Sequence, residues 1–225
     1  DCSGFGVNIG SPSSKINYTV QFINCQFFHN KMGNVRLYNI RNALFLRNIF
    51  HGGGKGIVLS GTDCSGATIM HNTIDGVGES SDGIDITAQS SQNGLIIRNN
   101  IICRHTRYGI NCDSNQEDGY SIIDHNAMPI DEVWKNVQGS YSPFFSVAGR
   151  EPVGIHDVTD APNFMRTNEE LIEDYRPTIV AYHGKAFPEA EVNIGLNSMT
   201  KTILQMGAMQ TKKNQPILKT DLKVR

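Results

Sequence analysis

The 225-residue chain has 20 Lys and Arg against 22 Asp and Glu, a formal charge of -2, and is 39 % hydrophobic. This balance gives no reason to expect the broad basic surface that phosphate-backbone binding requires, so no nucleic-acid partner is expected. The longest apolar runs, such as residues 178–181, fall far short of the roughly 20 residues that cross a bilayer, so no membrane insertion is expected. Repeat signals begin within the first ten residues, and we expect further repeat units before Asp1.

Cysteine usage indicates free thiols. The number is odd, and the chain is large enough to fold without disulfides, so at least one cysteine is unpaired and small buried thiols are predicted. The CxxC and CxxH spacings typical of structural zinc are absent, so neither a structural metal nor a cofactor is expected. The cysteines are Cys2, Cys25, Cys64, Cys103 and Cys112.

In chain order, the first predicted element recurs five times. Each copy has a bulky apolar residue three positions before a small polar residue and another two positions after it. The copies cover residues 22–27, 45–50, 69–74, 97–102 and 123–128. Their central positions are Cys25, Asn48, Asn72, Asn100 and Asn126, separated by 23, 24, 28 and 26 residues. The aligned asparagines predict a structural ladder, in which stacked amides hydrogen-bond from turn to turn and tolerate left-handed backbone.

A second short strand recurs in phase with the first. It covers residues 7–9, 35–37, 57–59, 84–86 and 110–112, and glycine directly precedes four of the five. Two registers with one period predict an all-β parallel β-helix, a solenoid in which equivalent strands stack in ladders. An α-containing solenoid would need a helical or leucine signature that is missing between these strands, and a β-sandwich would not explain the shared register.

The template disappears after residue 128, where prolines and aromatic residues become frequent. We therefore predict parallel β-helix rungs over residues 1–130, an irregular C-terminal cap with late rungs over 131–210, and a polar tail over 211–225. A short helix is predicted over residues 168–174. The cap covers the last rung, whose open edge would otherwise invite association with another chain.

These repeats resemble the pectate-lyase-like right-handed parallel β-helix superfamily, which includes polysaccharide lyases, polygalacturonases and phage tail-spike adhesins. The resemblance covers roughly residues 5–130. The segments 160–164, 174–177 and 206–210 also look like the closing motifs of bacterial and phage β-helix repeat proteins. The resemblance implies the fold more specifically than any activity, because one scaffold hosts many functions.

One segment resembles a catalytic motif of that superfamily. Residues 81–86, Ser-Asp-Gly-Ile-Asp-Ile, are similar to the N-T-D-G-I-D segment of polygalacturonases, which implies a catalytic role for Asp82. The family also has a paired aspartate motif one rung later. This chain has Thr-Arg-Tyr-Gly-Ile at residues 106–110 instead, and no Gly-His-Gly follows.

Two kinds of carbohydrate chemistry are compatible with the residues. Asp82 and Asp85 could supply the two carboxyl groups of glycoside hydrolysis. His105 and Arg107 could supply the base and the positive charge that uronate elimination needs. Calcium is compatible with uronate elimination, but no motif indicates it. The alternative for Asp82 is an ordinary Asp-Gly turn that leads into a strand.

Four loops occupy equivalent places in successive rungs, so their charged residues should line one edge. The candidate substrate-binding residues there and in the adjoining strand row are Lys55, Glu79, Arg104, Tyr108 and Asn111. Such an edge would suit an anionic glycan, although a solvated loop edge explains the same charges without a ligand.

Two function classes remain open from the sequence. The first is a virion-surface β-helix protein of a phage, a tail-spike or capsid-decoration type that engages a polysaccharide or cell-surface glycan. The second is a secreted polysaccharide lyase or glycoside hydrolase. The expected location is therefore the virion surface or the extracellular space, and the resemblance to adhesins implies a homotrimer or larger assembly.

Overall fold

The structure is a computed structural model that describes residues 2–11, 19–87, 94–112, 121–142 and 156–164. Among these residues, none belongs to a helix long and apolar enough to cross a membrane. The helix predicted over residues 168–174, the tail over 211–225, and the closing motifs at 174–177 and 206–210 lie outside the described residues.

The described strands form three parallel sheets, which we name A, B and C. Sheet A contains β1 (Phe5–Gly10), β4 (Gly33–Tyr38), β7 (Lys55–Ser60), β10 (Asp82–Ile86), β13 (Tyr108–Cys112) and β15 (Gly139–Tyr141). Sheet B contains β2 (Gln21–Ile23), β5 (Leu44–Leu46), β8 (Thr68–Met70), β11 (Ile96–Arg98) and β14 (Ile122–Asp124). Sheet C contains β3 (Gln26–Phe28), β6 (Ile49–His51), β9 (Thr73–Asp75) and β12 (Ile101–Cys103).

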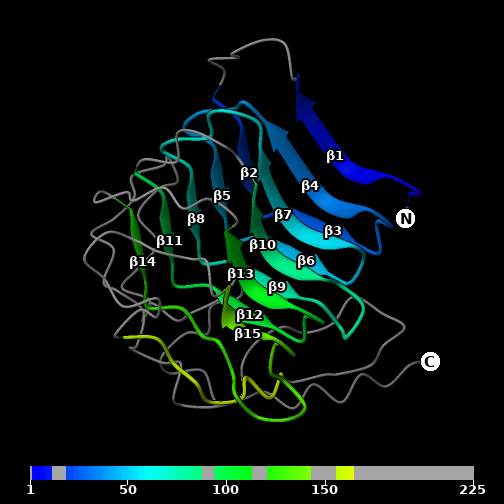
Figure 1. Cartoon of the computed structure of the whole chain (residues 1–225), viewed down its shortest axis with the longest axis vertical. Helices are drawn as coiled ribbons and strands as arrows, with labels where there is room; N and C mark the ends of the chain where they lie inside the picture. Colours follow the sequence, from blue (N-terminus) through cyan, green and yellow to red (C-terminus); the bar gives the residue numbers. More distant parts are fainter. Residues whose placement is uncertain (1, 12–18, 88–93, 113–120, 143–155, 165–225) are drawn as a thin grey trace, which may run out of the picture.

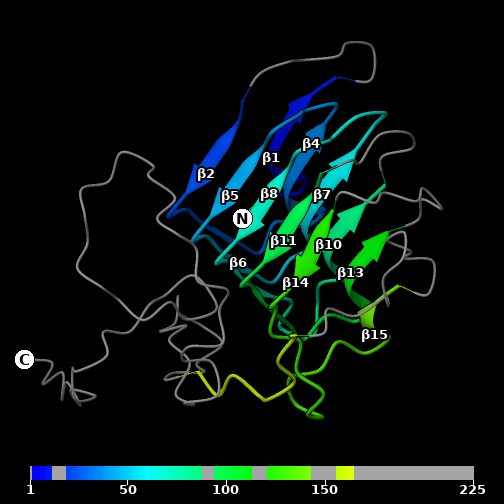
Figure 2. The same ribbon diagram turned by 90° about the vertical axis from the view of Figure 1, so that its left-hand side faces the viewer.

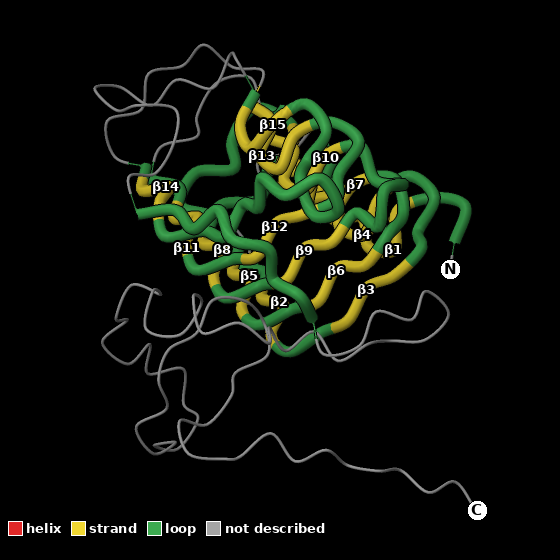
Figure 3. Tube along the Cα trace, turned by 90° about the horizontal axis from the view of Figure 1, so that it is seen from below, coloured by secondary structure: helices red, strands yellow, loops and turns green. Residues whose placement is uncertain are grey.

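The chain visits the three sheets in turn, and each of the first four rungs contributes one strand to each sheet. In the fifth rung, β13 and β14 are followed by β15 of sheet A, and Ala127 contributes an isolated bridge in place of a sheet C strand. Figure 1 shows the rungs stacked from β1 down to β15, and Figure 2 shows sheets A and B side by side. Figure 3, seen from below, shows the strands of sheet C lying next to one another. The predicted all-β solenoid is confirmed.

Alternation along the sheet A strands separates a core column from an outward row. Val35, Ile57, Ile84 and Ile110 are register partners from strand to strand and are completely buried. The residues that alternate with this column are also register partners on successive strands: Asn8, Arg36, Val58, Asp85 and Asn111. This row therefore defines the outer face of sheet A.

The asparagine ladder is confirmed at the corner between sheets B and C. Asn72 Oδ1 accepts the backbone N–H of Asn48 at 2.9 Å, and Asn100 Oδ1 accepts that of Asn72 at 2.9 Å. The predicted place of the left-handed backbone was wrong by one residue. Positive φ falls on the residue before the ladder position, at His71 (54°) and Asn99 (59°) for example, because that residue turns the chain from sheet B into sheet C.

The glycines at the second position of β7 and β10 are explained by rung spacing. A Cβ on Gly83 would lie 2.6 Å from the Gly109 carbonyl oxygen, and one on Gly56 would lie 2.3 Å from that of Gly83. Both distances are too short for a real contact. Stacked strands can therefore approach at this corner only where the side chain is absent.

Pairing continues past residue 130. Strand β15 pairs with β13, and Val158 pairs with Ala127. Asp157 Oδ1 accepts the backbone N–H of Asn126 at 2.7 Å, so an aspartate extends the asparagine ladder by one more rung. The domain division at residue 130 stays a prediction.

All five cysteines are free, as the odd count indicated for at least one of them. Cys64, Cys103 and Cys112 are buried, as predicted, whereas Cys25 is half-buried and Cys2 is exposed. Burial raises the pKa of the Cys103 thiol well above its ordinary value, with a further contribution from Asp75. The three buried thiols therefore behave as small apolar core side chains.

Candidate functional site

The predicted stacking of the loops between sheets C and A is confirmed by backbone hydrogen bonds. Ser81 N–H donates to Gly54 O at 2.8 Å, and Arg107 N–H donates to Ser81 O at 2.8 Å. The candidate residues of these loops do not form one site. The contacts divide them into two groups, which we name the Asp82 cluster and the Asp75 cluster.

The Asp82 cluster contains Lys55, Asp82, Asp85, Arg107, Tyr108 and Asn111. Lys55 Nζ bonds to Asp85 Oδ2 and lies 3.8 Å from Asp82 Oδ2. Arg107 reaches the same Asp82 oxygen at 3.6 Å. Two cations, one from the rung on each side, therefore converge on Asp82, and Lys55 also bonds to Asp85 on the same strand.

Asp82 is a buried carboxyl group with a perturbed pKa. Its side chain is completely buried, and its Oδ2 makes no hydrogen bond, although the two cations lie within 4 Å of it. Burial raises the pKa of Asp82 above its usual range, and the nearby negative charge of Asp85 raises it further. Perturbed carboxyl groups of this kind are more frequent at functional sites than elsewhere.

The two aspartates support the exposed members of the cluster. Asn111 Nδ2 donates to Asp85 Oδ1 at 2.8 Å, so both oxygens of Asp85 are engaged. The side chains of Lys55 and Arg107 are 29 % and 42 % exposed, whereas Asp85 and Asn111 are buried. The part of this cluster that a ligand could reach is therefore cationic, with the Tyr108 ring beneath the Arg107 guanidinium at 5.7 Å.

The Asp75 cluster contains His29, His51, Asp75, Glu79, Arg104 and Trp134. Arg104 binds the buried Asp75 carboxylate through two nitrogens, at 2.8 and 2.5 Å, and lies 4.8 Å from the centre of the Trp134 ring. Glu79 is exposed and lies 3.7 Å from His29. Arg104 and Glu79 were both predicted to bind substrate. They pair with Asp75 and His29, whereas Arg107 pairs with Asp82.

His105 lies close enough to the Asp75 cluster to interact electrostatically with Asp75 and Arg104, but its hydrogen bonds go to Asn136. Its side chain is buried, and its Nδ1–H donates to Asn136 Oδ1 at 2.8 Å. Burial lowers the pKa of this imidazole to about 4, so it is neutral near pH 7. Its proposed role as a base stays a prediction. Its side chain and its backbone N–H both bond to Asn136, so they connect residue 136 with the rung above it.

The sequence interpretation missed two groups of polar residues. Asn136, the partner of His105, lies in a segment without the repeat template. Asp124, His125 and His156 bring three metal-binding atoms together, within 4.8 Å of one another, from two separate segments. No spacing motif could have indicated this, because His156 comes from a later rung of irregular length.

The stacked sheets, the ladder and the polar outer face define a parallel β-solenoid. A family model described as the right-handed beta helix region matches residues 1–127. Since this match covers more than half of the chain, the protein belongs to the right-handed β-helix family. Searches of curated proteins and of solved structures gave no match.

Proposed function

We propose that the chain is a glycan-engaging β-helix protein of a phage virion surface, of the tail-spike or capsid-decoration type, and that the Asp82 cluster is the centre of its binding face. The observation that carries the binding site is the arrangement of Lys55 and Arg107. Both are partly exposed, and both lie within 4 Å of the buried Asp82 Oδ2 between them, while Lys55 also bonds to Asp85.

Preorganised cations are suited to sugar carboxylates and hydroxyl groups. A side chain already held in place loses less conformational entropy when a ligand binds. The adjoining outer face adds Arg36, whose guanidinium lies 5.7 Å from the Phe5 ring and 5.2 Å from the Tyr38 ring. This position adds a positive charge next to two aromatic rings, and successive rungs lie about 4.8 Å apart, a spacing that suits a linear chain of sugar rings.

The virion-surface location is supported by the cysteines and by the departure from a hydrolase motif. Five free cysteines are compatible with folding in a reducing cytoplasm, where phage particles assemble. The departure from the polygalacturonase motif also favours binding over cleavage. Assembly as a homotrimer or larger particle is part of this proposal, and light scattering of the purified chain measures it.

The test is calorimetric titration of the chain with a panel of acidic and neutral polysaccharides. For a polysaccharide that binds, Arg107→Ala should weaken binding by at least about tenfold, the effect of one charged hydrogen bond. Arg41→Ala is the matched control, because Arg41 is also 42 % exposed and also pairs with a buried aspartate, Asp63, but at the turn after β4.

Equal weakening by the two substitutions would contradict a site at Arg107, and the absence of binding to any polysaccharide would contradict the function. Circular dichroism of both variants shows whether they keep the fold.

A second candidate is a secreted lyase or hydrolase acting on acidic polysaccharide, favoured by the raised pKa of Asp82, which a general acid requires. New reducing ends that disappear in Asp82→Asn would identify a hydrolase. Unsaturated-uronate absorbance that disappears in Arg107→Ala would identify a lyase. Binding without either product would leave the non-catalytic function.

A further inference from the structure

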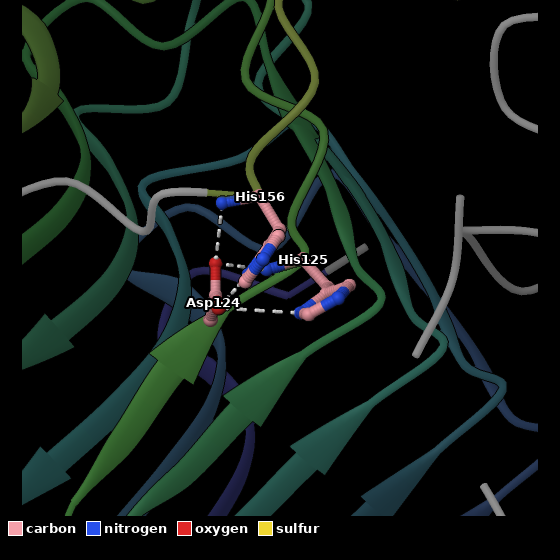
Figure 4. A group of neighbouring side chains, drawn as sticks. All are labelled: Asp124, His125 and His156. Atoms are coloured by element: carbon pink, nitrogen blue, oxygen red, sulfur yellow. Dashed lines mark hydrogen bonds and ion pairs between the residues drawn. The ribbon is translucent and has the colours of Figure 1, made fainter. Parts of the chain in front are cut away.

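A third polar cluster, the Asp124 cluster, lies at the far end of sheet B. It contains Asp124, His125 and His156, shown in Figure 4. Asp124 ends β14, and His125 forms the left-handed corner that follows it. His156 comes from the next rung and stacks its ring on that of His125, with centroids 4.5 Å apart. Two consecutive rungs therefore meet at this cluster.

The backbone fixes the Asp124 carboxylate before any ligand arrives. Its Oδ1 accepts the backbone N–H groups of His125 and His156, both at 2.9 Å. Its Oδ2 faces Nδ1 of His156 at 2.6 Å and Nδ1 of His125 at 3.3 Å. Two imidazole nitrogens and one carboxylate oxygen thus converge, while the other carboxylate oxygen holds the corner in shape.

We propose that Asp124, His125 and His156 form a binding site for a divalent transition-metal ion of the Zn²⁺ type. Imidazole nitrogen with one carboxylate oxygen is a donor set that zinc, nickel, copper and cobalt accept, whereas calcium and magnesium prefer oxygen ligands. No metal was expected from the sequence, because these three ligands follow no linear motif. The proposed site therefore differs from that expectation.

The distances agree with coordination after a small adjustment. Ligand atoms bound at about 2.0–2.2 Å to one ion lie roughly 3–3.5 Å apart. The separation between His125 and Asp124 already falls in this range, and the shorter one to His156 is a hydrogen bond that must open. The His156 side chain is 55 % exposed and can make this movement. The ion would replace the Nδ1 proton in that hydrogen bond.

Metal binding would connect the ends of two rungs. Three protein ligands leave at least one coordination position for water or another ligand, and the exposure of His156 places that position next to solvent. Because Asp157 and Val158 pair with Asn126 and Ala127 directly beside His156, the ion would reinforce the last described rung of the coil.

The experiment is calorimetric titration of the full chain with Zn²⁺, together with the absorption spectrum of the Co²⁺ form. One ion per chain should bind, and His156→Gln and Asp124→Asn should each weaken binding by about tenfold or more. The Co²⁺ spectrum should show nitrogen and oxygen ligands. Saturating Zn²⁺ should also raise the thermal midpoint of the wild type but not of His156→Gln.

The matched control is His29→Gln. His29 also contacts a second imidazole, that of His51, with centroids 4.9 Å apart, and lies 3.7 Å from the Glu79 carboxylate. This variant should bind Zn²⁺ like the wild type. The proposal is overturned if the wild type does not bind Zn²⁺, if the two cluster variants bind it unchanged, or if the Co²⁺ spectrum shows thiolate bands that disappear in Cys2→Ser.

Discussion

Replacing Asn72 with alanine should destabilise the coil more than any exposed substitution, because Asn72 occupies the centre of the ladder. Its Nδ2 donates to Phe45 O and to Asn100 Oδ1, both at 3.0 Å. Its Oδ1 accepts from the backbone N–H and from the Nδ2 of Asn48, both at 2.9 Å. Alanine removes all four bonds at a position with no solvent exposure.

The magnitude follows from the groups left behind. The amide N–H of Asn48 and the carbonyl of Phe45 each lose this partner inside the coil, at a cost of about 1–3 kcal/mol apiece. The free energy of unfolding should therefore fall by roughly 2–6 kcal/mol. Urea unfolding followed by circular dichroism measures this change. The control is Asn8→Ala, at an exposed position of β1, which should change stability by less than about 0.5 kcal/mol. A similar small effect for Asn72→Ala would refute the structural role of the ladder.

Three further predictions concern the packing and titration of single residues. Gly83→Ala should cost about 1–3 kcal/mol of stability, measured by urea unfolding, because the added Cβ would lie 2.6 Å from the Gly109 carbonyl oxygen; a neutral effect would contradict the rung spacing. His105 stays neutral down to a pKa of about 4 when folded but is protonated below about 6.5 when unfolded, so stability should fall by about 3 kcal/mol as pH drops from 6.5 to 4. His105→Gln should flatten that pH profile, and an unchanged slope would contradict it. Iodoacetamide should alkylate Cys2 in the native chain, whereas the buried Cys64, Cys103 and Cys112 should react only after the chain is unfolded. Mass spectrometry of the alkylated chain measures this difference, and alkylation of the buried thiols in the native chain would contradict their burial.

The fold could be predicted from the sequence because the rungs repeat their apolar positions. Each copy of the first template places two bulky residues around a small polar one. In the first four copies, the polar residue lies at the corner between sheets B and C, and one bulky residue lies in the strand on each side of it. The period identified the ladder from Asn48 to Asn126. The period did not predict the last member of the ladder, because Asp157 takes the place of the asparagine and follows a longer rung.

The candidate site could be predicted only in part. The rung positions correctly placed Lys55 and Arg107 near Asp82. They could not show that Arg104, three residues before Arg107, pairs with Asp75 instead. Pairing between rungs depends on side-chain direction at a turn, and the sequence pattern gives the rung but not that direction.

The most direct test of glycan binding at the Asp82 cluster is hydroxyl-radical footprinting of the chain with a polysaccharide that binds it. The account predicts that the polysaccharide protects Tyr108 from oxidation, because this ring lies beside Arg107 on the binding face. Val133, which is 67 % exposed and lies between β14 and β15, should be oxidised equally with and without the polysaccharide. Unchanged oxidation of Tyr108, or equal protection of Val133, would contradict the proposed site.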